Sequence, residues 1–170
     1  MYETLNRAVG WIARALALAG GLVLLILVGL TCLSILGRAL LPLGLGFGSI
    51  RGIYDMTEIG MAAAIFAFLP WAQYTEAHAR VDLLQPLMPR ALDRGLGFVF
   101  DIAMFCVALV GTWRLWLGMS DKMRHGETTL IAQIPVWWGY AAGLVGGIGF
   151  VLVAAFSILR ALRRMTGAEA

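Results

Sequence analysis

The sequence predicts an all-α membrane protein with four transmembrane helices. Hydrophobic residues make up 61% of the 170-residue chain, charged residues only 14%, and the mean hydropathy is +0.84. Soluble domains carry roughly 45–50% apolar and about 25% charged residues. Four apolar runs approach or exceed the roughly 20 residues that a helix needs to cross a bilayer. We therefore expect residues 1–170 to form a single four-helix membrane domain.

The first helix is expected over residues 9–41. The stretch Ala15–Gly37 has no ionisable group and is longer than the about 7–15 apolar residues of a cleaved signal peptide, so it should remain as an anchor. Pro42 and the glycines that follow it end this helix. The second helix is expected over residues 55–74, where the charge-free run 59–75 begins after a short acidic start.

The third and fourth helices follow a polar connection. The third is expected over residues 93–117, around an apolar run whose single charge is Asp101. The fourth is expected over residues 135–160, with Pro135 in its first turn, where a missing N–H costs little. Between the second and third helices, the polar segment before Pro89 is expected to form a short interfacial segment.

The distribution of basic residues predicts the orientation. Eight lie at the N-terminus, in the connection between helices 2 and 3, or in the tail, and five lie on the opposite side: Arg38, Arg51, Arg114, Lys122 and Arg124. The positive-inside rule then places both termini in the cytoplasm. The sequence pI of about 9.2 is explained by basic ends meeting anionic membrane lipid, and no nucleic-acid partner is expected.

Charged residues inside the predicted spans are costly and raise the question of a functional role. Similar depth in the membrane predicts two intramembrane ion pairs: Asp101 with Arg14 near the cytoplasmic side, and Glu58 with Arg38 or Arg114 near the outer side. Pairing or snorkelling at the interface is favoured over an ion path. An ion path needs polar groups at mid-membrane, and the fourth helix has none between Tyr140 and Ser157.

Residues for catalysis or metal binding are scarce. A zinc site needs three or four ligands in tetrahedral reach, but the chain has two histidines and two cysteines. The predicted topology places His78 and His125 on opposite sides of the membrane. No nucleophile elbow, Gly-rich phosphate loop or metalloprotease motif occurs. We expect no enzymatic activity, no metal and no cofactor in this chain.

The fourth span contains the run GYAAGLVGGIGF, in which Gly139, Gly143 and Gly147 stand at successive i, i+4 positions. Overlapping steps of this kind allow two helices to approach closely. A tight helix contact is therefore predicted, with a partner helix inside or outside this chain.

Four helices with little mid-membrane polarity are underequipped to carry a hydrophilic solute. Solute carriers show repeated halves and broken helices that meet at a midplane site, and neither is evident here. An accessory subunit of a larger membrane complex fits better. The alternative is a self-associating small membrane channel.

Two motifs resemble those of a known family. The stretch HARVDLLQPLMP after the second span resembles the His-x-Arg-Val-Asp-Leu-Leu signature of the small, DctQ-like membrane subunit of TRAP (tripartite ATP-independent periplasmic) transporters. GETTLIAQIPVWWGY resembles that family's Gly-Glu-Thr element and Ile-Pro-x-Trp approach to the fourth helix. The motif positions are His78, Arg80 and Asp82, for which the resemblance implies a structural role in a cytoplasmic turn.

The resemblance implies a multi-pass subunit of the bacterial inner membrane. Its partners would be a large multi-helix permease subunit, which carries the sodium and substrate sites, and a periplasmic binding protein that delivers an organic acid. Uptake would be driven by an ion gradient, with the small subunit as a scaffold. Residues expected in the outer loops, where the binding protein would dock, are Arg51, Lys122, Arg124 and Glu127.

Overall fold

Four long helices account for most of the chain. The computed structural model describes residues 2–44, 48–77 and 90–165. The helices are α1 (Tyr2–Ala39), α2 (Ile53–Tyr74), α3 (Arg90–His125) and α4 (Trp137–Met165), with a short 3-10 turn, η1 (Leu41–Leu43), after α1. Each of the four is long and apolar enough to cross a membrane, which confirms the predicted fold class. The predicted interfacial segment and its motif residues lie outside the described residues.

Three helices extend well beyond the predicted bounds, among them α4, which begins at Trp137, after Pro135, and continues to Met165 rather than ending near residue 160. α1 begins at Tyr2 rather than near residue 9, and α3 continues to His125 rather than ending near residue 117. The early start of α1 is explained by contacts with α4. The Tyr2 ring stacks on Phe156 with 5.7 Å between ring centroids, and the Arg163 guanidinium lies 4.1 Å from the Tyr2 ring centroid. Such contacts hold a polar helical turn in place beyond the apolar run.

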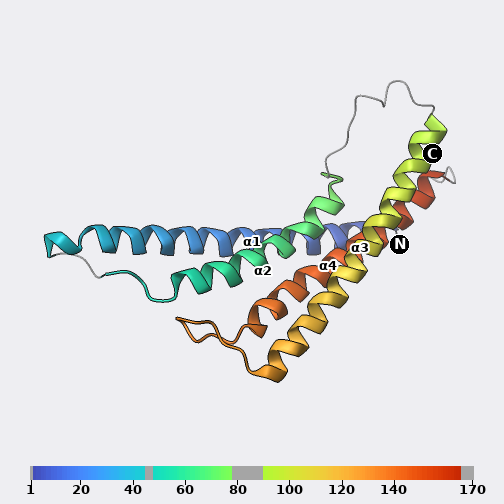
Figure 1. Ribbon diagram of the computed structural model, residues 1–170. Coiled ribbons are helices and arrows are strands. Elements are labelled where there is room, and N and C mark those ends of the chain that lie inside the picture. Colours follow the sequence, from blue (N-terminus) through green and yellow to red (C-terminus); the bar gives the residue numbers. More distant parts are fainter. Residues whose placement is uncertain (1, 45–47, 78–89, 166–170) are drawn as a thin grey trace.

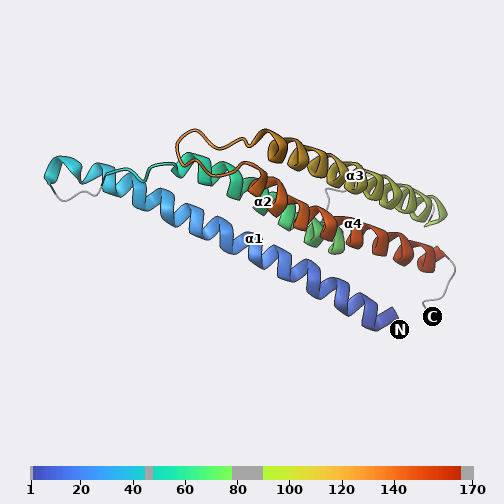
Figure 2. The ribbon, with the colours of Figure 1, turned by 90° about the horizontal axis from the view of Figure 1, so that it is seen from below.

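The helices form an open layer in the order α1, α2, α4, α3 (Figures 1 and 2). α1 packs on α2, α2 on α4 and α4 on α3, while α1 touches α4 less extensively. The start of α1 and the end of α4 lie together at one end, which we call the termini end. The opposite end, which we call the loop end, holds the end of α1, the start of α2 and the connection between α3 and α4.

This arrangement leaves most apolar surface uncovered. In the most apolar stretch of α4, 56% of the residues are buried, against 11% in α1 and 6% in α3. A small cluster of Ala108, Phe150 and Ala154 marks the packing of α3 on α4. A layer with such broad apolar faces is stable only against lipid or another membrane protein.

Candidate functional site

The predicted glycine stripe of α4 contacts helices of the same chain. A Cβ placed at Gly139 or Gly143 would lie 3.3 or 3.4 Å from a side chain of α2, and one at Gly147 would lie 2.9 Å from Thr112 Oγ1 of α3. The first two distances are close to ordinary van der Waals contact. The stripe therefore allows α4 to pack between α2 and α3, as small residues do in membrane helices.

The closest approach occurs at a glycine that the i, i+4 pattern did not select. A Cβ at Gly146 would lie 2.4 Å from the carbonyl carbon and oxygen of Phe66, and 2.8 Å from the backbone nitrogen of Ala67. These are backbone atoms of α2, which cannot rotate away. The sequence signal was the density of glycines from 146 to 149, three in four residues. Gly146 is thus the position where the backbones of α2 and α4 meet.

At the loop end, the connection between α3 and α4 folds back on itself. The Val136 N–H donates to the Glu127 carbonyl at 3.0 Å, and the Thr129 N–H donates to the Ile134 carbonyl at 2.9 Å. Gly126 begins the turn with a φ of 62°, a left-handed conformation that glycine adopts without steric cost. We call residues 126–136 the outer loop.

Asp55 attaches the outer loop to the first turn of α2. Its Oδ2 accepts hydrogen bonds from the backbone N–H groups of Ile131 at 3.0 Å and Ala132 at 2.8 Å. Gly52 is required beneath this contact, because a Cβ there would lie 2.5 Å from the Ala132 Cβ. The attachment leaves the tip of the loop outside, where Leu130 is 92% exposed. The outer loop therefore has a defined position and presents an apolar tip.

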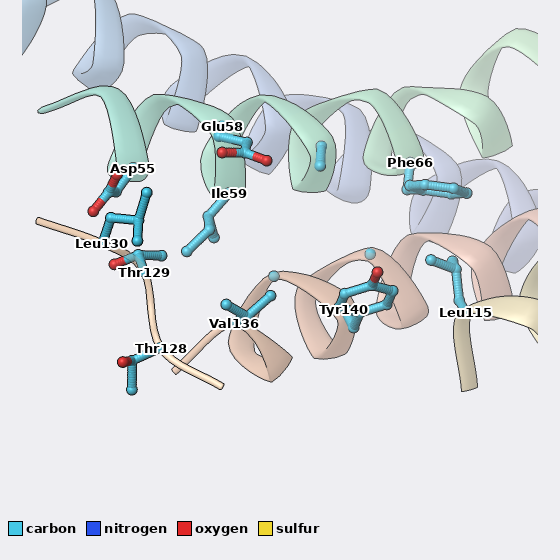
Figure 3. Close-up of a pocket in the computed structure, with 13 residues that line it drawn as sticks. Asp55, Glu58, Ile59, Phe66, Leu115, Thr128, Thr129, Leu130, Val136 and Tyr140 are labelled. Carbon is cyan, nitrogen blue, oxygen red and sulfur yellow. The ribbon is translucent and has the colours of Figure 1, made fainter. Parts of the chain in front are cut away.

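Behind the outer loop, α2 and α4 enclose a half-open cleft of about 440 Å³ (Figure 3). Its lining comes from three helices and the loop, and includes Asp55, Glu58, Ile59, Phe66, Leu115 and Tyr140. Asp55 lies beside the outer loop and Glu58 farther along α2, whereas Phe66, Tyr140 and Leu115 line the end away from the loop.

The predicted ion pair of Glu58 with Arg38 or Arg114 is wrong. Within the part of the chain that the structure describes, neither pair comes within ion-pair distance. Arg38 instead donates from Nη2 to Ser49 Oγ at 3.1 Å, which attaches the α1–α2 connection to α1. Arg114 belongs to α3, which packs mainly on α4. Two residues at a similar depth in the membrane need not lie on neighbouring helices.

The predicted ion pair of Arg14 with Asp101 is also absent among the described residues. α1 and α3 lie at opposite edges of the helix layer, so Arg14 and Asp101 belong to helices that are not neighbours in it. Asp101 Oδ1 accepts a hydrogen bond from Gln73 Nε2 of α2, at 3.5 Å. The acidic side chain in α3 therefore faces across the layer toward α2.

The four predicted docking residues all lie at the loop end, but two of them neutralise each other. Lys122 Nζ and Glu127 Oε2 are 2.6 Å apart. Arg51 and Arg124 are exposed and have no ion-pair partner among the described residues. Of these four residues, the two arginines therefore supply the positive charge that is not paired.

A polar network at the termini end was not anticipated from the sequence. Arg160 of α4 forms an ion pair with Glu76 at 2.8 Å and donates to the Tyr74 carbonyl at 3.3 Å. The hydroxyl of Tyr74 donates to Asn6 Oδ1 of α1 at 3.1 Å. The network connects three helices just before residues 78–89, where the motif residues His78, Arg80 and Asp82 fall outside the described part. No three potential metal-ligating side chains gather among the described residues.

Comparison with known proteins identifies the family. The family described as Tripartite ATP-independent periplasmic transporters, DctQ component, matches residues 27–165, which include the C-terminal part of α1 and all of α2, α3 and α4. No curated protein and no solved structure matches the chain. The family match confirms the resemblance carried by the motif after the second span and by the approach to the fourth. The chain therefore belongs to the DctQ component family, the small inner-membrane subunits of TRAP transporters.

Proposed function

We propose that this subunit scaffolds the large permease subunit of its TRAP transporter. The transporter would take up an organic acid, a carboxylate delivered by a periplasmic binding protein, and an ion gradient would drive the uptake. The observation that carries the proposal is the open helix layer. Only α4 is largely buried within the chain, so α1, α2 and α3 offer apolar surface for a larger membrane partner.

Features at both ends of the layer support a rigid role. At the loop end, Asp55 attaches the outer loop to α2. At the termini end, the pair Arg160–Glu76 connects α4 to the end of α2. Between them, Gly146 brings the backbones of α2 and α4 together. A scaffold needs this property, because a moving partner must work against a surface that does not deform.

The composition of the central helix supports assigning the solute path to the partner. Between Tyr140 and Ser157, α4 consists of glycine and apolar residues. Charged solutes need polar groups at membrane depth. We therefore place the substrate and sodium sites in the large subunit.

The arginines at the loop end support a docking role for this end. We propose that both termini face the cytoplasm, as the distribution of basic residues predicts, and that the loop end faces the periplasm. Arg51 and Arg124 would then attract acidic side chains of the binding protein. Lys122 and Glu127 contribute little net charge because they are paired.

Reconstitution into vesicles tests the scaffold proposal. Uptake of radiolabelled carboxylates is measured with the small subunit alone, the large subunit alone, and both together with the binding protein, under a sodium gradient. We expect uptake only with both membrane subunits present. Uptake by the small subunit alone would refute the proposal and favour a self-associating channel.

Charge reversal tests the docking role. We expect the double variant Arg51→Glu, Arg124→Glu to weaken binding of the binding protein to the reconstituted complex. The matched control is Lys122→Glu with Glu127→Lys, which exchanges a paired charge without changing the net charge. Equal effects of the two double variants would contradict the proposed docking role.

A further inference from the structure

The cleft between α2 and α4 changes in polarity along its length. Asp55 and Glu58 line it from the first turns of α2, with Asp55 beside the outer loop, and Phe66 and Leu115 line the end away from the loop (Figure 3). From residue 55 to residue 66, α2 advances about 16 Å at roughly 1.5 Å per residue. The cleft therefore begins at charged groups near the end of a span and continues between apolar walls toward its middle. A leaflet of the bilayer has the same gradient.

Glu58 is the group in this cleft that the chain itself does not neutralise. It is exposed near the start of α2 and has neither an ion pair nor a hydrogen bond among the described residues, and a carboxylate at the edge of a membrane span is stabilised by a cationic partner. Asp55 differs, because two loop amides bind its Oδ2. The negative charge calls for a cation in the cleft.

The opposite wall of the cleft is held in position by the packing of α4 on α3. Tyr140 of α4 lines the cleft, and its ring packs against α3, where a Cβ at Gly118 would lie 2.6 Å from Tyr140 Cε1. Its hydroxyl forms no hydrogen bond among the described residues. A ligand in the cleft therefore meets a hydroxyl group as well as the carboxylate.

The volume decides which class of occupant fits. A helix of about 10–12 Å diameter fills roughly 500 Å³ in each turn of about 5.4 Å, more than the whole cleft of about 440 Å³. A whole partner helix therefore does not fit inside the cleft, and only a slender group can enter it. A slender amphiphile fits, with its cationic end near the outer loop and its hydrocarbon farther in.

We propose that this cleft binds a phospholipid with a primary ammonium headgroup, of the phosphatidylethanolamine type. The ammonium donates to Glu58, and the upper part of an acyl chain lies against Ile59, Phe66 and Leu115. The choice of a primary ammonium follows from the carboxylate, which accepts N–H hydrogen bonds. The proposal goes beyond the scaffold role and does not depend on it.

The test compares two lipids with identical acyl chains. Phosphatidylcholine carries three N-methyl groups where phosphatidylethanolamine carries N–H donors. The purified full-length subunit is titrated with each lipid in detergent, and bound lipid is counted by native mass spectrometry. We expect the ethanolamine lipid to bind about fivefold more tightly, the scale of one charge-assisted hydrogen bond at a partly hydrated site.

Two variants and a control separate the headgroup from the acyl chain. Glu58→Gln should abolish the preference, so that the two lipids bind with about equal affinity. Glu127→Gln should keep the preference, because Glu127 pairs with Lys122 and does not line the cleft. Ala62→Leu fills the apolar part of the cleft and should weaken binding of both lipids.

Three results would overturn the proposal. The first is equal binding of the two lipids by the unaltered subunit. The second is a preference that survives Glu58→Gln. The third is loss of the preference when the large subunit is bound, which would show that a basic side chain of the partner pairs with Glu58.

Discussion

Replacing Gly146 by alanine adds one methyl group where the backbones of α2 and α4 are in closest contact. That methyl group would lie 2.4 Å from the carbonyl carbon and oxygen of Phe66. Backbone atoms in a helix cannot move aside without breaking hydrogen bonds, so the two helices must separate. Gly143 is a matched control in the same helix, because a Cβ there meets only side-chain atoms, the nearest being Phe66 Cδ2 at 3.4 Å.

The size of the effect follows from comparing the two variants. Overpacking a tight contact costs about 1–3 kcal/mol. The gain in helix propensity from glycine to alanine, about 1 kcal/mol, is the same at both positions and cancels. Gly146→Ala should therefore be less stable than Gly143→Ala by about 1–3 kcal/mol. For a chain of this size, 1 kcal/mol corresponds to a melting-temperature difference of roughly 2–4 °C.

Thermal unfolding of both variants in the same detergent provides the measurement. Tryptophan fluorescence reports the unfolding temperature, and size-exclusion chromatography confirms that both variants start as the same species. If Gly146→Ala melts at or above the temperature of Gly143→Ala, the backbone contact between α2 and α4 does not carry the stability assigned to it.

Two further predictions concern the ends of the helix layer. Asp55→Ala removes the acceptor of two loop amides, so hydrogen exchange at Ile131 and Ala132 should become severalfold faster. Exchange in the middle of the helices should stay unchanged. Unchanged exchange at the two loop amides would contradict the attachment of the loop by Asp55. Arg160→Gln and Glu76→Gln should each lower the unfolding temperature. In a double-mutant cycle they should show a coupling of about 1 kcal/mol, because the pair is partly buried; strictly additive effects would disprove the interaction.

The spans could be predicted from the sequence because the requirement for apolar residues is local. A stretch such as Ala15–Gly37 is long and apolar enough to cross a bilayer whatever surrounds it. The exact helix ends could not be predicted. α1 starts at Tyr2 because that ring stacks on Phe156 of α4, a contact between residues at opposite ends of the chain.

The intramembrane ion pairs failed as predictions for a related reason. Depth along a helix can be counted from the sequence, and it correctly placed Glu58 and Arg38 at the same end of the layer. Which way a side chain faces, and which helix lies beside it, depend on the order of packing. That order, α1, α2, α4, α3, differs from the order in the chain.

The packing of the glycine-rich face of α4 could be predicted only in part. Spacing indicated that α4 would pack closely, and Gly139, Gly143 and Gly147 do face neighbouring helices. The tightest contact nevertheless falls on Gly146. Which glycine contacts the backbone of α2 depends on where α2 crosses α4. The i, i+4 rule considers one helix alone and therefore cannot identify that glycine.

By itself, the sequence determined that this protein is a four-helix membrane subunit of the DctQ family, because hydropathy and short motifs are properties of consecutive residues. The tertiary structure alone decided that the helices form an open layer, that Asp55 holds the outer loop, that Arg160 pairs with Glu76, and that Glu58 faces a cleft. These features join residues distant in the chain. Their partners are set by how the helices cross, which no local pattern encodes.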